Sequence, residues 1–85
     1  MVTRYARRST ATYFFWVHPT FLDSVTDLQL KIYEEDMTLL ETIDADAATT
    51  PDGLYQTDTA WVAPAVGLYR LHWVGTAIDD WETLL

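Results

Sequence analysis

The chain has 85 residues, no cysteine, and 13 acidic against five basic residues, which give a formal net charge of -8 at pH 7. This length provides one small domain, and the lack of cysteine excludes disulfides, thiolate metal ligands and cysteine nucleophiles. The longest apolar run, residues 13–17, falls far short of the roughly 20 residues of a membrane span. No apolar stretch of a secretory signal follows the N-terminal arginines, so we expect neither a transmembrane segment nor a signal peptide.

The composition favours strands over helices, because 34 of the 85 residues are Val, Ile, Thr, Tyr, Phe or Trp and no stretch keeps apolar residues at helical spacing for long. The first strand is predicted over residues 9–17 and ends before Pro19, which lacks a backbone donor. Both of its faces are apolar: Phe14 and Trp16 lie on one, and Tyr13, Phe15 and Val17 on the other. We expect the core to cover one face, and a partner or the chain itself to cover the other.

The clearest strand covers residues 25–33, where Leu28, Leu30 and Ile32 alternate with polar residues. This alternation is typical of a half-buried antiparallel strand. The acidic segment 34–37 predicts a connection to a short strand over residues 38–43. Residues 44–52 are rich in Asp, Ala and Thr and predict a loop with room for a short edge strand.

Three further strands follow, separated by turns. Pro51-Asp52-Gly53 is a strong turn signal, residues 63–67 form the next turn, and Gly75-Thr76 breaks the chain again. The alternating residues between these turns predict four core aromatics, namely Tyr55, Trp61, Tyr69 and Trp73. With a last strand over residues 78–85, the pattern predicts an all-β fold: a single small immunoglobulin-like antiparallel β-sandwich of six to seven strands, or alternatively a small β-barrel.

Charge is unevenly distributed along the chain. Residues 1–8 carry Arg4, Arg7 and Arg8 and no acid, whereas residues 9–85 carry two bases against 13 acids, a net charge of -11. We interpret residues 1–8 as a basic arm, which either docks on an acidic neighbouring subunit or is simply a frayed terminus, and residues 9–85 as the domain. Because the domain would repel phosphate, we expect no nucleic acid and no anionic membrane as partner.

No pattern of reactive side chains points to catalysis. The acids at 34–36, 44–46 and 79–80 fall in predicted turns or loops, where carboxylates are normally solvated, and none has the spacing of an EF-hand calcium loop. His18 and His72 have no third zinc ligand at a defined spacing. The chain also has no nucleophile elbow and no glycine-rich phosphate loop. We therefore expect no enzyme, no metal and no cofactor.

The aromatic residues point to an interface instead. The chain has twelve of them, more than so small a core can hide, and it ends on two leucines. Because the surplus gathers near the two ends of the chain, we expect a protein interface rather than a flat carbohydrate platform. The predicted partner contacts are Arg4, Tyr5, Arg7, Arg8, Tyr13, Phe15, Phe21, Trp81, Leu84 and Leu85.

The order of these features resembles a known family. An arginine-bearing lead, an aromatic strand, the alternating stretch 27–33, Gly53-Leu54-Tyr55 and the segment 67–75 are similar to the small immunoglobulin-like β-sandwich proteins encoded among the head and tail genes of tailed phages and prophages. The resemblance covers about residues 9–83. It departs from the family pattern after Tyr33, where Glu34-Glu35-Asp36-Met37 stands in place of the common Asp-Gly.

The resemblance implies a non-enzymatic virion protein, present as a homo-oligomer or in many symmetric copies. Its first implied role is a capsid decoration or cement protein bound to the major capsid protein, and the alternative is a head–tail connector or tail accessory protein that binds other virion proteins. A hypothesis of another class is a carbohydrate- or cell-surface-binding immunoglobulin-like module. That hypothesis predicts exposed Trp and Tyr side chains in one coplanar row.

Overall fold

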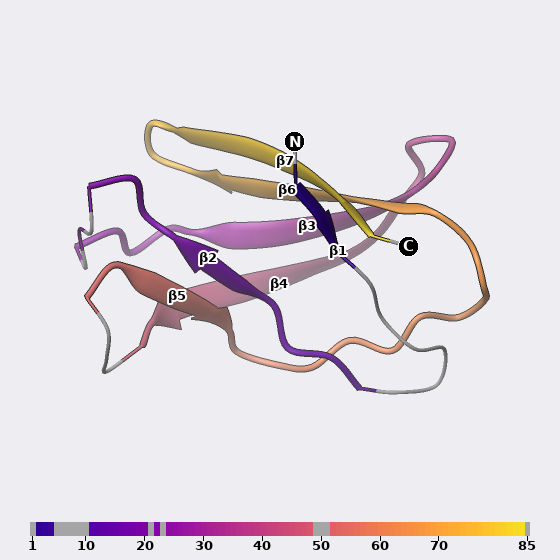
Figure 1. Cartoon of the computed structure of the whole chain (residues 1–85), viewed down its shortest axis with the longest axis horizontal. Coiled ribbons are helices and arrows are strands. Elements are labelled where there is room, and N and C mark those ends of the chain that lie inside the picture. The colour runs from indigo at the N-terminus through magenta and orange to yellow at the C-terminus, as the bar shows by residue number, and fades with distance from the viewer. Residues whose placement is uncertain (1, 5–10, 21, 23, 49–51, 85) are drawn as a thin grey trace.

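A computed structural model describes residues 2–4, 11–20, 22, 24–48 and 52–84. Every regular element in this part of the chain is a strand, which confirms the prediction of an all-β fold of six to seven strands (Figure 1). The strands are β1 (Val2–Arg4), β2 (Phe15–Val17), β3 (Gln29–Glu34), β4 (Leu39–Ala47), β5 (Leu54–Thr57), β6 (Tyr69–Gly75) and β7 (Ile78–Leu84).

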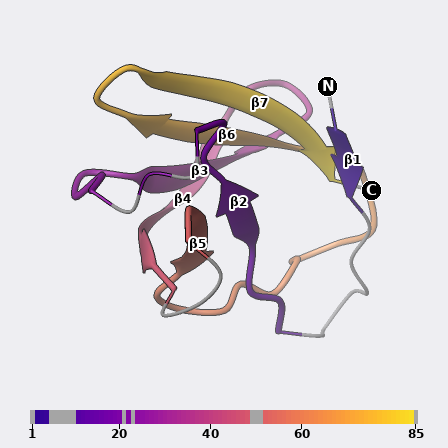
Figure 2. The same ribbon diagram turned by 60° about the vertical axis from the view of Figure 1, so that its left-hand side comes forward.

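All seven strands belong to one sheet in the order β1-β7-β6-β3-β4-β5-β2. Neighbours are antiparallel except β1, which runs parallel to β7. The sheet is strongly curled, so that β2 and β5 turn back under the layer that contains β6 and β7 (Figures 1 and 2). The bend is in β4, whose first part pairs with β3 and whose last residues, 45–47, pair with β5. The strands therefore form one half-barrel sheet rather than two separate sheets.

The core fills the inside of this curl. Leu28, Leu30 and Ile32 are buried, as the alternation of the second predicted strand requires. The four aromatics predicted for the core, Tyr55, Trp61, Tyr69 and Trp73, are buried as well. Burying large apolar side chains is the main stabilising contribution available to a domain of this size.

Two buried tyrosines also fix loops through their hydroxyl groups. The Tyr55 hydroxyl donates to the Leu22 carbonyl at 2.8 Å and accepts from the Val25 amide at 3.1 Å. The Tyr69 hydroxyl donates to the Ala65 carbonyl at 2.7 Å, an arrangement that also occurs at the tyrosine corner of immunoglobulin-like domains. The repeated Gly-Leu-Tyr of the sequence thus places one loop-fixing tyrosine near the start of β5 and another at the start of β6.

Two predicted elements differ from the sequence-based expectation. β4 continues through Asp44 to Ala47, where the sequence predicts a loop with room for a short edge strand. Asp44 pairs with β3, residues 45–47 pair with β5, and Ala45 is buried. Of the strand expected over residues 9–17, the structure describes residues 11–17, and in these only β2 is regular. An isolated bridge between Thr12 and Trp61 precedes β2.

The hairpin between β6 and β7 is held by a side chain from the segment that precedes β3. The Asp27 carboxylate accepts hydrogen bonds from the Thr76 amide at 2.9 Å and from the Thr76 hydroxyl at 2.5 Å. The next residue, Ala77, has a φ of 60°, a left-handed conformation that costs an L-residue with a side chain free energy. The predicted turn at Gly53 does contain a positive φ, of 80°.

The first residues of the predicted arm belong to the sheet. Val2 pairs with Glu82, and Arg4 pairs with Leu84. The backbone of residues 2–4 is therefore part of the domain, while residues 5–8 of the predicted arm lie outside the described part of the chain.

Candidate binding surface

The outer side of β2 and of the residues just before it presents three large apolar side chains to solvent. Tyr13, Phe15 and Val17 are 48%, 41% and 52% exposed. They alternate with Phe14 and Trp16, which are buried in the core. The predicted core face of this segment is thus buried, and the side chains of the other face are partly exposed. We call Tyr13, Phe15 and Val17 the β2 outer face.

Hydrogen bonds to β5 and its surroundings hold this segment in its orientation. Thr57 donates its amide to the Phe14 carbonyl at 3.0 Å, and its hydroxyl accepts from the Phe14 amide at 3.1 Å. His18 donates its amide to the Gly53 carbonyl at 2.8 Å. Successive side chains of a strand point to opposite sides, so anchoring Phe14 and Trp16 inward directs their neighbours outward.

The surface beside the β2 outer face becomes polar and acidic within two strands. Phe15 lies opposite Gln56 on β5, which in turn lies opposite Asp46 on β4. Val17 lies opposite the partly buried Leu54. Because β2 is the last strand of the sheet, the apolar side chains stand at an edge and the carboxylates stand further in.

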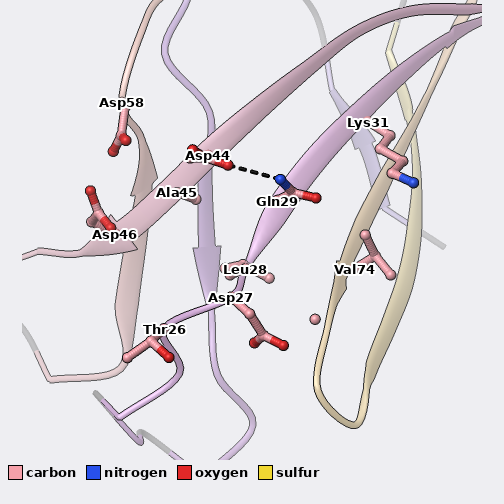
Figure 3. Close-up of a pocket in the computed structure, with 11 residues that line it drawn as sticks. Thr26, Asp27, Leu28, Gln29, Lys31, Asp44, Ala45, Asp46, Asp58 and Val74 are labelled. Carbon is pink, nitrogen blue, oxygen red and sulfur yellow. Dashed lines mark hydrogen bonds between the residues drawn. The ribbon is translucent and has the colours of Figure 1, made fainter.

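Four carboxylates surround a neighbouring cavity of about 600 Å³ (Figure 3). Asp27, Asp44, Asp46 and Asp58 lie around it, and Lys31 is the one basic side chain in its lining. The Gln29 amide donates to Asp44 Oδ1 at 2.9 Å. Among the described residues no group of three or more His, Asp or Glu side chains is arranged to hold a metal ion.

Two of these carboxyl groups are perturbed in opposite directions. A hydrogen bond with Asp46, followed by desolvation and by the charges of Asp46 and Asp44, raises the pKa of Asp58 above its usual value. The hydrogen bonds from the hydroxyl and amide of Thr76 lower the pKa of Asp27. Asp58 and Asp46 therefore repel each other at neutral pH, whereas the Asp27 carboxylate is stabilised.

A separate aromatic cluster lies on the outer side of β3, β6 and β7. The Trp81 and His72 rings stack with centroids 3.9 Å apart and planes 6° apart, and Tyr33 lies 5.7 Å from Trp81 at 33°. His72 Nε2 also contacts Asp79 Oδ1 at 2.5 Å. Trp81, a predicted partner contact, is half-buried in this cluster, and one face of its ring is covered by His72.

The other predicted contact residues are not gathered at one place. Leu84 is buried in the core, so its side chain does not face a partner. Arg4 lies in β1 at the edge of the sheet opposite to β2. The remaining predicted contacts, Tyr5, Arg7, Arg8, Phe21 and Leu85, lie outside the described residues.

The sequence did not reveal the role of two acids on β7. Glu82 is only 4% exposed and its Oε1 accepts a hydrogen bond from Trp73 Nε1 at 3.1 Å. Asp80, expected to be solvated in a turn, accepts from Trp16 Nε1 at 2.8 Å. The sequence signal for this role is that Ile78, Asp80, Glu82 and Leu84 are every second residue of one strand, so that two carboxylates share a side with two apolar residues. Two tryptophans supply the hydrogen-bond donors to these carboxylates.

Comparison with known proteins gives no relative: no protein-family model, curated protein or solved structure matches the chain. Among the described residues there is no helix long and apolar enough to cross a membrane. The function must therefore be argued from the chain's own surfaces.

Proposed function

We propose that the chain is a non-enzymatic structural protein that acts by docking to another protein through the β2 outer face. The single observation that carries the proposal is the exposure of Phe15 and Val17 on the edge strand β2 and of Tyr13, two residues before it. Contiguous exposed apolar side chains are uncommon on small monomeric proteins and mark surfaces that become covered. Tyr and Phe are also enriched where partners bind.

The position of this face at an edge strengthens the argument. An apolar edge strand is a liability in solution, because it invites unspecific pairing, and proteins normally protect such edges with charge or cover. Here no charged residue stands among residues 13–17, while carboxylates follow at Asp58, directly after β5, and at Asp46 on β4. A partner that covers β2 would bury the apolar strip and leave the acidic surface in water.

We place this docking in the virion of a tailed phage. The support is the sequence resemblance over about residues 9–83, and the first candidate partner is the major capsid protein, which the chain would decorate or cement. A head–tail connector or tail accessory position is the alternative within the same class. Either role uses the chain in many symmetric copies.

The carbohydrate-binding alternative receives less support from the surface. It requires exposed Trp and Tyr rings in one coplanar row. Trp16, Trp61 and Trp73 are buried in the core, and Trp81 is stacked against His72. We therefore favour a protein partner.

The proposal is tested on phage particles released from the organism that carries the gene. Particles are purified by density, and an antibody raised against the chain is used to detect it. We expect the chain to be present in particles of wild type and absent from particles of a Phe15→Asp strain, with Glu41→Gln as a matched surface control that is retained. Particles that lack the wild-type chain would refute the virion placement, and retention of Phe15→Asp would refute docking through the β2 outer face.

A further inference from the structure

The curled sheet has an open side, which we call the β2–β7 seam. β1 pairs only with residues 82–84 of β7, so no described strand pairs with residues 78–81 on the edge away from β6. β2 is the last strand at the other end of the sheet. The end of β2 approaches the β6–β7 hairpin in both views (Figures 1 and 2), where Trp16 Nε1 donates to Asp80 Oδ2 at 2.8 Å.

The register of β7 determines which backbone groups face the seam. Gly75 and Ile78 are the pair that closes the two-residue hairpin between β6 and β7. In such a hairpin the closing pair is hydrogen-bonded, and hydrogen-bonded pairs then alternate along the ladder. Asp79 and Trp81 therefore direct their amide and carbonyl groups away from β6. These are the groups that an added strand would use.

A cavity of about 340 Å³ lies in the seam beside this edge. Its apolar lining includes Trp16, Ile78 and Pro19, and the first two of these are buried. Its acidic lining is the pair Asp79 and Asp80, which follow each other in β7 and so point to opposite sides of the strand.

Each of these two carboxylates keeps capacity to accept further hydrogen bonds. Asp79 Oδ1 contacts His72, and Asp80 Oδ2 accepts from Trp16. Within the described part of the chain, neither second oxygen has a hydrogen-bond partner. The Asp79 side chain is also 76% exposed. The seam thus combines unpaired backbone groups, an apolar floor and two carboxylates with free acceptor capacity.

We propose that the β2–β7 seam binds an extended segment of a partner protein, which adds as a strand to residues 78–81 of β7 and places an arginine side chain in the cavity. Main-chain hydrogen bonds supply affinity in such strand addition, and side-chain pockets supply specificity. The aliphatic part of arginine matches the lining of Trp16 and Ile78, and its guanidinium matches Asp80, which lies on the same side of β7 as Ile78. Residues 9–85 carry a net charge of -11, which favours a basic partner.

This site is distinct from the β2 outer face. Trp16 points into the curl toward Asp80, whereas Phe15 and Val17 point outward from the same strand. One partner could occupy the seam while another surface covers the outer face. The proposal therefore stands or fails independently of the virion role.

The test uses the intact 85-residue chain labelled with ¹⁵N and a blocked peptide, Ac-Thr-Val-Arg-Val-Thr-NH₂, followed by NMR titration. We expect saturable shifts of the Asp79 and Trp81 amides and of the Trp16 indole N–H. A peptide with Gln in place of Arg should bind several-fold more weakly, and one with Pro in place of both Val should not bind, because Pro cannot donate to the ladder. Shifts elsewhere only, or equal binding of the Arg and Gln peptides, would overturn the proposal.

Protein variants provide a second readout of the same site. Asp80→Asn should weaken the binding of the Arg peptide by up to about 5-fold, as expected for an exposed charge pair, and added salt should shrink this difference. Glu41→Gln removes one negative charge on β4, with β3 and β6 between it and β7, and should leave binding unchanged. Equal affinity of wild type and Asp80→Asn for the Arg peptide would contradict recognition by this carboxylate. Concentration-dependent shifts of the same amides without peptide would assign the seam to a second copy and overturn the proposal of a basic partner.

Discussion

Phe14 and Phe15 are adjacent and chemically identical, yet their rings lie on opposite faces of one segment, one 1% and the other 41% exposed. Replacing Phe14 by Ala removes a buried ring that packs 6.4 Å from Trp61, and such a change costs about 3–5 kcal/mol of unfolding free energy. A domain of this size has a total of roughly 4–13 kcal/mol. We therefore expect Phe14→Ala to lower Tm by more than about 12 °C, and Phe15→Ala to change the free energy by less than about 1 kcal/mol.

The measurement is urea unfolding of each variant followed by tryptophan fluorescence and circular dichroism, with the slope m checked for constancy. If Phe14→Ala does not fold, Phe14→Leu serves in its place, with an expected loss of about 1–2 kcal/mol. If Phe15→Ala lost as much unfolding free energy as Phe14→Ala, independently of protein concentration, our reasoning would be refuted, because the chain itself would then cover the Phe15 ring. A cost that grows with protein concentration would show self-association through the β2 outer face.

The remaining predictions concern charges, turns and one buried acid, and each is measured by thermal unfolding. The pKa of Asp27 is lowered in the folded state, so this carboxylate contributes stability that is present at neutral pH and is lost as pH falls through the folded-state pKa. Asp27→Asn should therefore lower Tm at pH 7 and have less effect on Tm near pH 3. The pKa of Asp58 is raised in the folded state, so its contribution to stability is present at low pH and is lost as pH rises. Asp58→Asn should therefore raise Tm at pH 7, and a lower Tm would contradict the repulsion between Asp58 and Asp46. Ala77→Gly should stabilise by up to about 1 kcal/mol by relieving the positive φ, whereas Gly75→Ala should destabilise, because the new Cβ would lie 3.1 Å from an Asp27 oxygen. Glu82→Leu should cost about 1–3 kcal/mol by leaving a buried indole N–H unpaired, and Glu82→Gln should recover most of it; equal losses would show that the hydrogen bond is not what matters.

The central strands could be predicted because their burial alternates cleanly. Leu30 and Ile32 on β3, and Leu71 and Trp73 on β6, face the core at every second position, and period-2 alternation is the strongest sequence signal of a half-buried strand. The end of β4 gave no such signal. Only Ala45 is buried in Asp44–Ala47, and this segment is a strand because of its partners on both sides, which lie far away in the sequence.

The edges of the sheet were the least predictable part. β1 is three residues long and pairs in parallel with β7, and a short parallel edge strand has no alternation of its own to detect. Tyr13 and Phe15, which the sequence analysis named as partner contacts, are exposed, but the sequence could not separate them from Leu84, which is buried. That distinction depends on which strand faces the inside of the curl, and this follows only from the tertiary fold.

The acids of β7 explain why the two candidate surfaces lie on either side of one short strand. Ile78, Asp80, Glu82 and Leu84 share one side of β7, on which Glu82 is buried and Asp80 is exposed. A buried carboxylate is costly unless it receives hydrogen bonds. Trp73 supplies a donor to Glu82 from the core, and Trp16 supplies one to Asp80 across the β2–β7 seam. Trp16 must therefore point inward, which in turn forces Phe15 and Val17 outward. The same indole that completes the inner face of the sheet thus determines which side chains β2 can offer to a partner.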